Sequence, residues 1–157
     1  RFVVTTKNEW NPMSVLAELF VQIGHVFTVL KNSPYLEKDR KIDDLGDEMS
    51  DVVFQLIIIG NMYNFDFENY QSEKIYNATL EDLIIVIGQL SEAVMENCGH
   101  RFEKARQGFS TTLDFIKFKI KQSFDIVFEI TKLFDLKLEV EYQKMIDSAN
   151  NWLDKNY

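Results

Sequence analysis

Hydrophobic residues recur at the spacing of an α-helix over most of this chain. Between residue 12 and about residue 31 they are separated by three or four positions, which places them on one face of a helix. The predicted core face of this helix comprises Leu16, Leu19, Phe20, Ile23, Phe27 and Leu30. The same periodicity predicts further helices over about 42–63, 67–76, 79–96, 111–134 and 138–154. No alternating pattern typical of strands competes with it, so the expected fold class is all-α.

Residues that favour helix ends mark several of these boundaries. Asn11 followed by Pro12 is typical of a helix start, because asparagine accepts hydrogen bonds from free amides and proline lacks one. Thr79 and Asp82 have the spacing of a capping box, and Asp66 would cap the short helix 67–76. Gly99 can adopt the left-handed conformation that often ends a helix.

Two polar stripes interrupt the otherwise apolar helices. On the helix 42–63 the stripe is Asp44, Glu48, Asp51 and Gln55, and on the helix 12–31 it is Glu18, Gln22 and His25. The helix 42–63 is apolar on nearly all its other faces, which predicts that it is buried. Buried carboxylates are costly unless a cation accompanies them, so the stripe suggests a divalent metal or a basic partner.

Composition narrows the classes of partner and compartment. The chain has 157 residues, which suffices for one domain with a core, and its net charge of −8 disfavours nucleic acid or an anionic membrane as partner. The longest run without a charged residue, 52–65, is too short to span a bilayer, so we expect no membrane helix. A single cysteine, Cys98, excludes an internal disulfide and favours a reducing, cytoplasmic location.

The two halves of the chain resemble each other. Residues 19–26 align with 83–90, and the same order continues with two further matches, 36–41 with 102–107 and 51–54 with 125–128. We therefore expect one domain over 1–157 with internal repeats at about 12–76 and 79–154. Each repeat would be a helical hairpin, and the two would pack as a four-helix bundle, a single-chain pseudo-dimer with extra short helices outside.

Two of these motifs resemble those of a known family. The first includes Ile23-Gly24, and the second is Gly46-Asp47-Glu48-Met49-Ser50-Asp51-Val52-Val53; together they resemble the MazG-like, all-α nucleoside triphosphate pyrophosphohydrolases, over roughly residues 16–152. The resemblance implies hydrolysis of a nucleoside triphosphate to the monophosphate and pyrophosphate. It implies Mg²⁺ held by a Glu-x-x-Glu pair and a Glu-x-x-Asp pair. Separately, His25 as a nitrogen ligand would shift the preference toward a softer ion such as Mn²⁺. The family includes dimeric enzymes, so a homodimer is also implied.

The chain departs from the family pattern at several of these positions. Glu48 and Asp51 match the second motif and are the expected catalytic and metal-binding residues, whereas Gln22 and His25 replace the glutamates of the first motif. Glu18, His25 and Asp44 are further candidate metal ligands. In the second repeat the four corresponding positions hold only one carboxylate, and we expect that repeat to be structural; the residues are Val86, Gln89, Gln122 and Asp125.

Basic residues between the first two helices are candidates for binding substrate phosphates. The substrate-binding candidates are the basic residues Lys38, Arg40 and Lys41, together with Gln22 of the first helix. The alternative for the three basic residues is a solvated loop. Three functions stay open on the sequence. They are an active pyrophosphohydrolase, a catalytically impaired module that binds nucleotide or protein, and a helical bundle whose acidic stripe pairs with lysine or arginine.

Overall fold

A computed structural model of the protein describes residues 10–31 and 45–156. These residues form five helices, namely α2 (Pro12–Lys31), α3 (Leu45–Met62), α4 (Leu80–Asn97), α5 (Thr112–Leu133) and α6 (Leu138–Asn156). No strand occurs within the two described ranges. The prediction of an all-α fold is confirmed.

The helix ends follow the capping residues that the sequence contains. The Asn11 side chain accepts from the amides of Met13 and Ser14, both at 3.0 Å. Thr79 opens α4 with the predicted capping box, and Thr111 opens α5 with a second one. Gly99, with φ of 76°, ends α4 in the left-handed conformation, as predicted.

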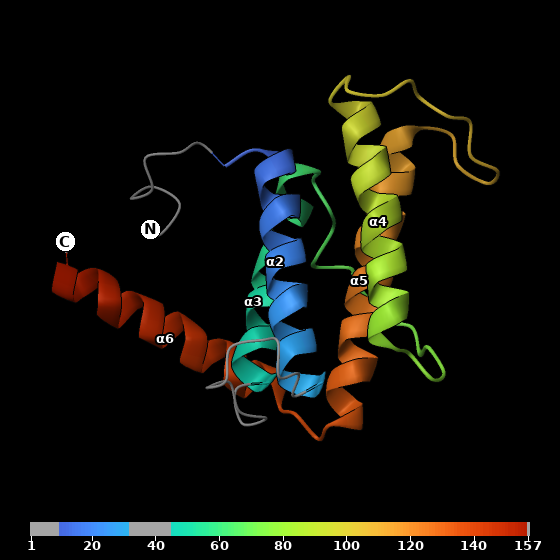
Figure 1. Ribbon diagram of the computed structural model, residues 1–157. Coiled ribbons are helices and arrows are strands. Elements are labelled where there is room, and N and C mark those ends of the chain that lie inside the picture. The colour runs from blue at the N-terminus through green and yellow to red at the C-terminus, as the bar shows by residue number, and fades with distance from the viewer. Residues whose placement is uncertain (1–9, 32–44, 157) are drawn as a thin grey trace.

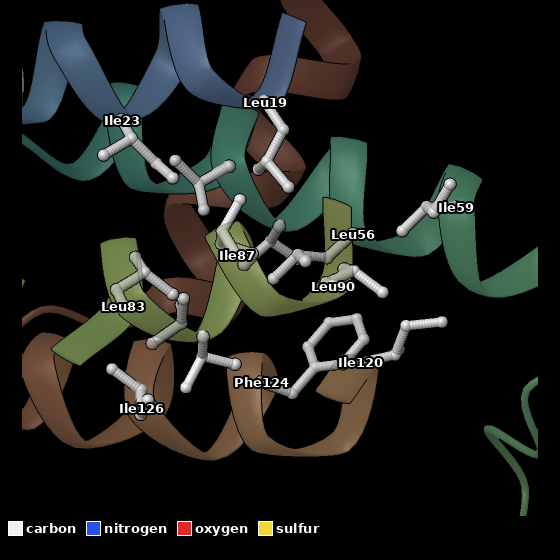
Figure 2. Packing of buried hydrophobic residues seen from close by; sticks show 14 of the residues in the cluster. Leu19, Ile23, Leu56, Ile59, Leu83, Ile87, Leu90, Ile120, Phe124 and Ile126 are labelled. Carbon is white, nitrogen blue, oxygen red and sulfur yellow. The ribbon is translucent and has the colours of Figure 1, made fainter. Parts of the chain in front are cut away.

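Two pairs of helices make up the body of the molecule. α2 packs along α3 and α4 packs along α5, and the pairs meet where α3 contacts α5 and α2 contacts α4 (Figure 1). Apolar side chains from all four helices converge between them (Figure 2). α6 packs on the start of α3, where Gly46 leaves room for Glu141, and then extends away from the other helices.

The buried face of α2 differs from the predicted one at Phe20. Leu16, Leu19 and Ile23 are buried as expected, but the Phe20 side chain is 41% exposed. Val15, Val26 and Val29 are buried in addition. α2 is apolar on more than one face, so its periodicity alone does not define the side that packs.

The predicted helix over 67–76 is wrong. Residues 63–79 instead form turns and irregular structure, although Asp66 does accept the amide of Asn69 at 3.1 Å. Aromatic contacts hold this segment against α5, and they join Phe65, Phe67 and Tyr70 to Phe124 and Phe128. Burial of these rings in extended structure outweighs the weak local preference for a helix.

α2 is long and apolar enough to meet the criterion for a membrane-spanning helix, which the sequence analysis did not expect of any segment. By length and composition alone, Pro12–Leu30 could cross a membrane, and it is the one such helix among the described residues. The prediction considered only runs free of charge, whereas this segment contains Glu18. Core helices and signal sequences meet the same criterion, so it does not by itself assign the chain to a membrane.

Gly60 of α3 provides a test of how the segment 63–79 is held. A Cβ at Gly60 would lie 2.4 Å from Cζ of Phe67, whose ring also packs on Phe65 and Phe124. We expect Gly60→Ala to displace this ring and to lower the free energy of unfolding by about 1–3 kcal/mol in urea denaturation.

Gly88 of α4 is the matched control, because a Cβ there would meet no atom within 4 Å. Gly88→Ala should raise the free energy of unfolding by about 0.5–1 kcal/mol through helix propensity. Equal effects of the two substitutions would contradict close packing of Phe67 on Gly60.

Candidate functional site

The two predicted polar stripes face each other between α2 and α3. We call the described members the polar seam: Glu18, Gln22 and His25 from α2, and Glu48, Asp51 and Gln55 from α3. Nδ1 of His25 lies 3.3 Å from Oε2 of Glu48. The helices form an antiparallel hairpin (Figure 1), so this contact sets a register in which Gln22 is opposite Asp51 and Glu18 is opposite Gln55.

Hydrogen bonds connect the α2 side of the polar seam. Nε2 of Gln22 donates to Oε1 of Glu18 at 2.8 Å, and Nδ1 of His25 lies 3.1 Å from Oε1 of Gln22. Both oxygens near His25 Nδ1 are acceptors, so this nitrogen carries the proton in this arrangement. Donors therefore point along one direction, from Gln22 to Glu18 and from His25 to Gln22 and Glu48.

Burial differs among the residues of the polar seam. The His25 side chain is 35% exposed, and that of Glu48 is 8% exposed. Asp51 is half-buried, and Gln55 is only 4% exposed. The side-chain oxygen of Gln55 is buried without a hydrogen-bond partner. Glu48 and Gln55 are thus the buried members of the seam, and His25 and Asp51 are partly exposed.

Glu48 and Asp51 are suited to Mg²⁺ that is shared with a phosphate. Their spacing of three residues puts both carboxylates on one face of α3, and Mg²⁺ in proteins commonly uses one or two carboxylates together with water and substrate phosphates. Within 10–31 and 45–156 no group of three or more His, Cys, Asp or Glu side chains could hold a metal by itself. Among the described residues, Glu48 and Asp51 therefore fit an ion that is shared with a phosphate.

Four of the candidate residues lie outside the residues that the structure describes. They are the metal-ligand candidate Asp44 and the substrate-binding candidates Lys38, Arg40 and Lys41. Their assignments stay predictions.

The second helix pair has no counterpart of the acidic pair on α3. Val86 is buried, Gln89 is exposed, and Oε1 of Gln122 accepts from Nζ of Lys119 at 2.6 Å. Lys119 is itself partly buried, which lowers its pKa. These positions of α4 and α5 bring no two carboxylates together.

Asp125 is the one carboxylate at those positions, and its contacts are structural. Its Oδ1 accepts from the Tyr70 hydroxyl at 2.8 Å and from the Glu73 amide at 2.9 Å, while Oδ2 accepts from Lys121 at 2.9 Å. Burial raises the pKa of Tyr70, which therefore stays a neutral donor. Asp125 is 2% exposed, so this network fixes the segment after α3 onto α5.

The basic residues of the loop between α4 and α5 are paired with carboxylates of α4. Arg106 donates to both oxygens of Glu96, at 2.7 and 3.0 Å, and Lys104 pairs with Glu92. Arg106 holds the pKa of Glu96 below its usual value. Lys104 and Arg106 align in sequence with Lys38 and Arg40, but the positions of the first repeat that align with Glu92 and Glu96 hold threonine and asparagine.

Sequence reasoning missed two features of these sites. It did not identify the Glu96–Arg106 pair, although the sequence order of carboxylate, turn and arginine was visible as a signal. It also did not predict that Gln55 would be buried with an oxygen unpaired, for which the sequence gives no signal beyond its place on the stripe.

No family model matches this chain, and comparisons with curated proteins and with solved structures also gave no match. The resemblance to MazG-like enzymes therefore rests on the motif residues themselves.

The Glu96–Arg106 pair predicts a pH dependence of stability. Because the pKa of Glu96 is lowered on folding, the pair stabilises the protein above the unfolded-state value near 4.5, and this contribution is lost as the pH falls below it. We expect Glu96→Gln to lower the free energy of unfolding by about 2 kcal/mol at pH 7. The difference from wild type should shrink below pH 4.5.

Glu92→Gln is the control, because its pair with Lys104 is more exposed and should contribute less. Urea denaturation at several pH values measures both variants. A difference between Glu96→Gln and wild type that stays constant down to pH 3 would contradict the assigned role of the pair.

Proposed function

We propose that this protein is a divergent, metal-dependent nucleoside triphosphate pyrophosphohydrolase of the MazG-like type. The observation that carries the proposal is the 3.3 Å approach of His25 to Glu48. Through this approach the residues at the two motif positions face each other across one helical hairpin. The acidic pair is partly buried there, next to hydrogen-bond donors, which suits a bound polyphosphate and its cation.

Each residue of the polar seam has a role in this proposal. Glu48 and Asp51 would hold Mg²⁺ or Mn²⁺, which when bound supplies charge neutralisation of the phosphates and a more acidic water. The Nδ1–H of His25 is directed to Gln22 and Glu48, whereas the second N–H of the Gln22 carboxamide is a donor of the kind that phosphate oxygens accept. Glu18 accepts from Gln22 and so orients that carboxamide. Water would cleave one phosphoanhydride bond, giving the monophosphate and pyrophosphate.

The proposal extends to the arrangement of the two helix pairs and to the location and partners of the protein. We infer that the pairs α2–α3 and α4–α5 are two repeats of one hairpin, arranged as a four-helix pseudo-dimer in which the second repeat is structural. The contacts of Asp125 with Tyr70 and Lys121 support that division of roles. A cytoplasmic location, a homodimer, and the absence of nucleic-acid and membrane partners belong to the same proposal.

A second candidate is a module that binds nucleotide without turnover. The observation in its favour is that Gln22 and His25 stand where two glutamates are expected, and both make hydrogen bonds within the polar seam. Loss of two negative charges weakens the hold on a divalent cation. The third function left open by the sequence is a helical bundle whose acidic residues pair with lysine or arginine. In the second helix pair, Asp125 is paired in this way with Lys121.

Pyrophosphate release distinguishes the first two candidates. We expect turnover of at least one nucleotide in a panel of ribonucleoside and deoxyribonucleoside triphosphates with Mg²⁺ or Mn²⁺. Glu48→Gln should lower kcat/KM by about 100-fold or more, because even residues that only support metal ligands contribute about 10–100-fold.

Gln122→Ala is the matched control, since Gln122 aligns with Glu48 in the second helix pair and bonds only Lys119 there. It should leave kcat/KM unchanged. Binding of nucleotides by wild type without turnover above the Glu48→Gln background would favour the second candidate instead.

His25 provides a separate prediction about the metal. If its imidazole is a ligand, it should favour a softer ion than Mg²⁺. We therefore expect His25→Ala to weaken Mn²⁺ binding about tenfold in calorimetric titration, with a smaller effect on Mg²⁺. Equal affinities of the variant and wild type for Mn²⁺ would remove His25 from the ligand set and leave it as a donor to Glu48.

A further inference from the structure

We propose that Gln55 determines nucleotide specificity, through its buried side-chain oxygen accepting a hydrogen bond from an amino-bearing base. This inference rests on the function proposed above. It goes beyond that function by assigning the base-binding end of the site and the class of base.

The starting observation is an unsatisfied polar atom. Gln55 is 4% exposed, and its Oε1 has no hydrogen-bond partner. Buried polar atoms in folded proteins are nearly always paired, because an unpaired one retains its full desolvation cost. An exception of this kind suggests a missing partner, and here that partner must be a donor because the free atom is an acceptor.

Gln55 lies on the face of α3 that carries the acidic pair. It follows Glu48 by seven residues and Asp51 by four, so all three side chains leave the helix in nearly the same direction. At a rise of about 1.5 Å per residue, Gln55 lies about 10 Å along the helix from Glu48. That separation matches the length of a nucleotide from its phosphates to its base.

The chemistry of this end of the polar seam favours an amino group. By the register that the His25–Glu48 contact sets, the residue opposite Gln55 is Glu18, another acceptor. Phosphate oxygens are acceptors and would be repelled here, whereas an exocyclic amino group has two N–H bonds to donate. Cytosine, adenine and guanine carry such a group, and uracil and thymine do not.

The exposure of His25 compared with that of Gln55 agrees with this orientation of the ligand. The His25 side chain at one end of the polar seam is 35% exposed, whereas Gln55 at the other end is 4% exposed. A charged triphosphate suits the accessible end, because full burial of its charge would be costly. A flat base suits the closed end, where apolar neighbours of α3 such as Leu56 and Ile59 are fully buried.

Calorimetric binding to the full chain with Mg²⁺ tests the inference. The ligands are the α,β-methylene analogues of CTP, ATP and UTP, together with inorganic tripolyphosphate, which has no base. We expect wild type to bind the CTP or ATP analogue at least fivefold more tightly than the UTP analogue. Gln55→Met keeps the approximate shape of the side chain and removes its oxygen. It should abolish this preference and leave the affinity for tripolyphosphate unchanged.

Two controls keep the outcomes distinct. Gln89→Met changes an exposed glutamine of α4 and should change none of the four affinities. Thermal unfolding should show Gln55→Met to be at least as stable as wild type, since it removes an unpaired buried atom.

The possible results distinguish the role of Gln55 from the proposed function. If wild type binds all four ligands and Gln55→Met keeps the same preference among bases, the role of Gln55 is overturned and the proposed function stands. If wild type prefers the UTP analogue, the role of Gln55 is likewise overturned. If wild type binds neither nucleotide nor tripolyphosphate, the proposed function fails and the inference fails with it.

Discussion

The structure depends on compensation of charge that is buried between apolar helices. Glu48 is 6% exposed on a helix whose other faces also pack, so its carboxylate needs partners within the protein. His25 supplies one from α2, and Gln22 and Glu18 continue the row of hydrogen bonds. Because these contacts are local to one hairpin, the relative register of α2 and α3 and the layout of the candidate site follow from the same interactions.

The second helix pair meets the same requirement with different chemistry. Glu96 is paired with Arg106, and Asp125 with Lys121, Tyr70 and a backbone amide. These carboxylates are fixed by positive charge from the chain itself. In the proposed function this hairpin contributes packing, and the α2–α3 hairpin carries the site.

Much of the fold could be predicted because helix periodicity and capping are local properties. Asn11, Thr79 and Gly99 act where their chemistry indicates, and both polar stripes were visible from spacing alone. Phe20 and the segment 67–76 were wrongly predicted, since each is decided by packing against distant residues. Two partners of Asp125, Glu73 and Tyr70, are 52 and 55 residues away in sequence, so spacing within a helix could not reveal them. The opposition of His25 and Glu48 followed from pattern, whereas the unpaired oxygen of Gln55 did not.

The aromatic cluster between residues 65 and 70 and α5 has a consequence for the evolution and folding of the chain. The linker that joins the two hairpins is anchored to the second one by stacked rings and by Asp125. Removing α5 would expose these rings to water, which is unfavourable. A recombination event that replaced α5 would therefore leave the rings of the linker without their packing partners.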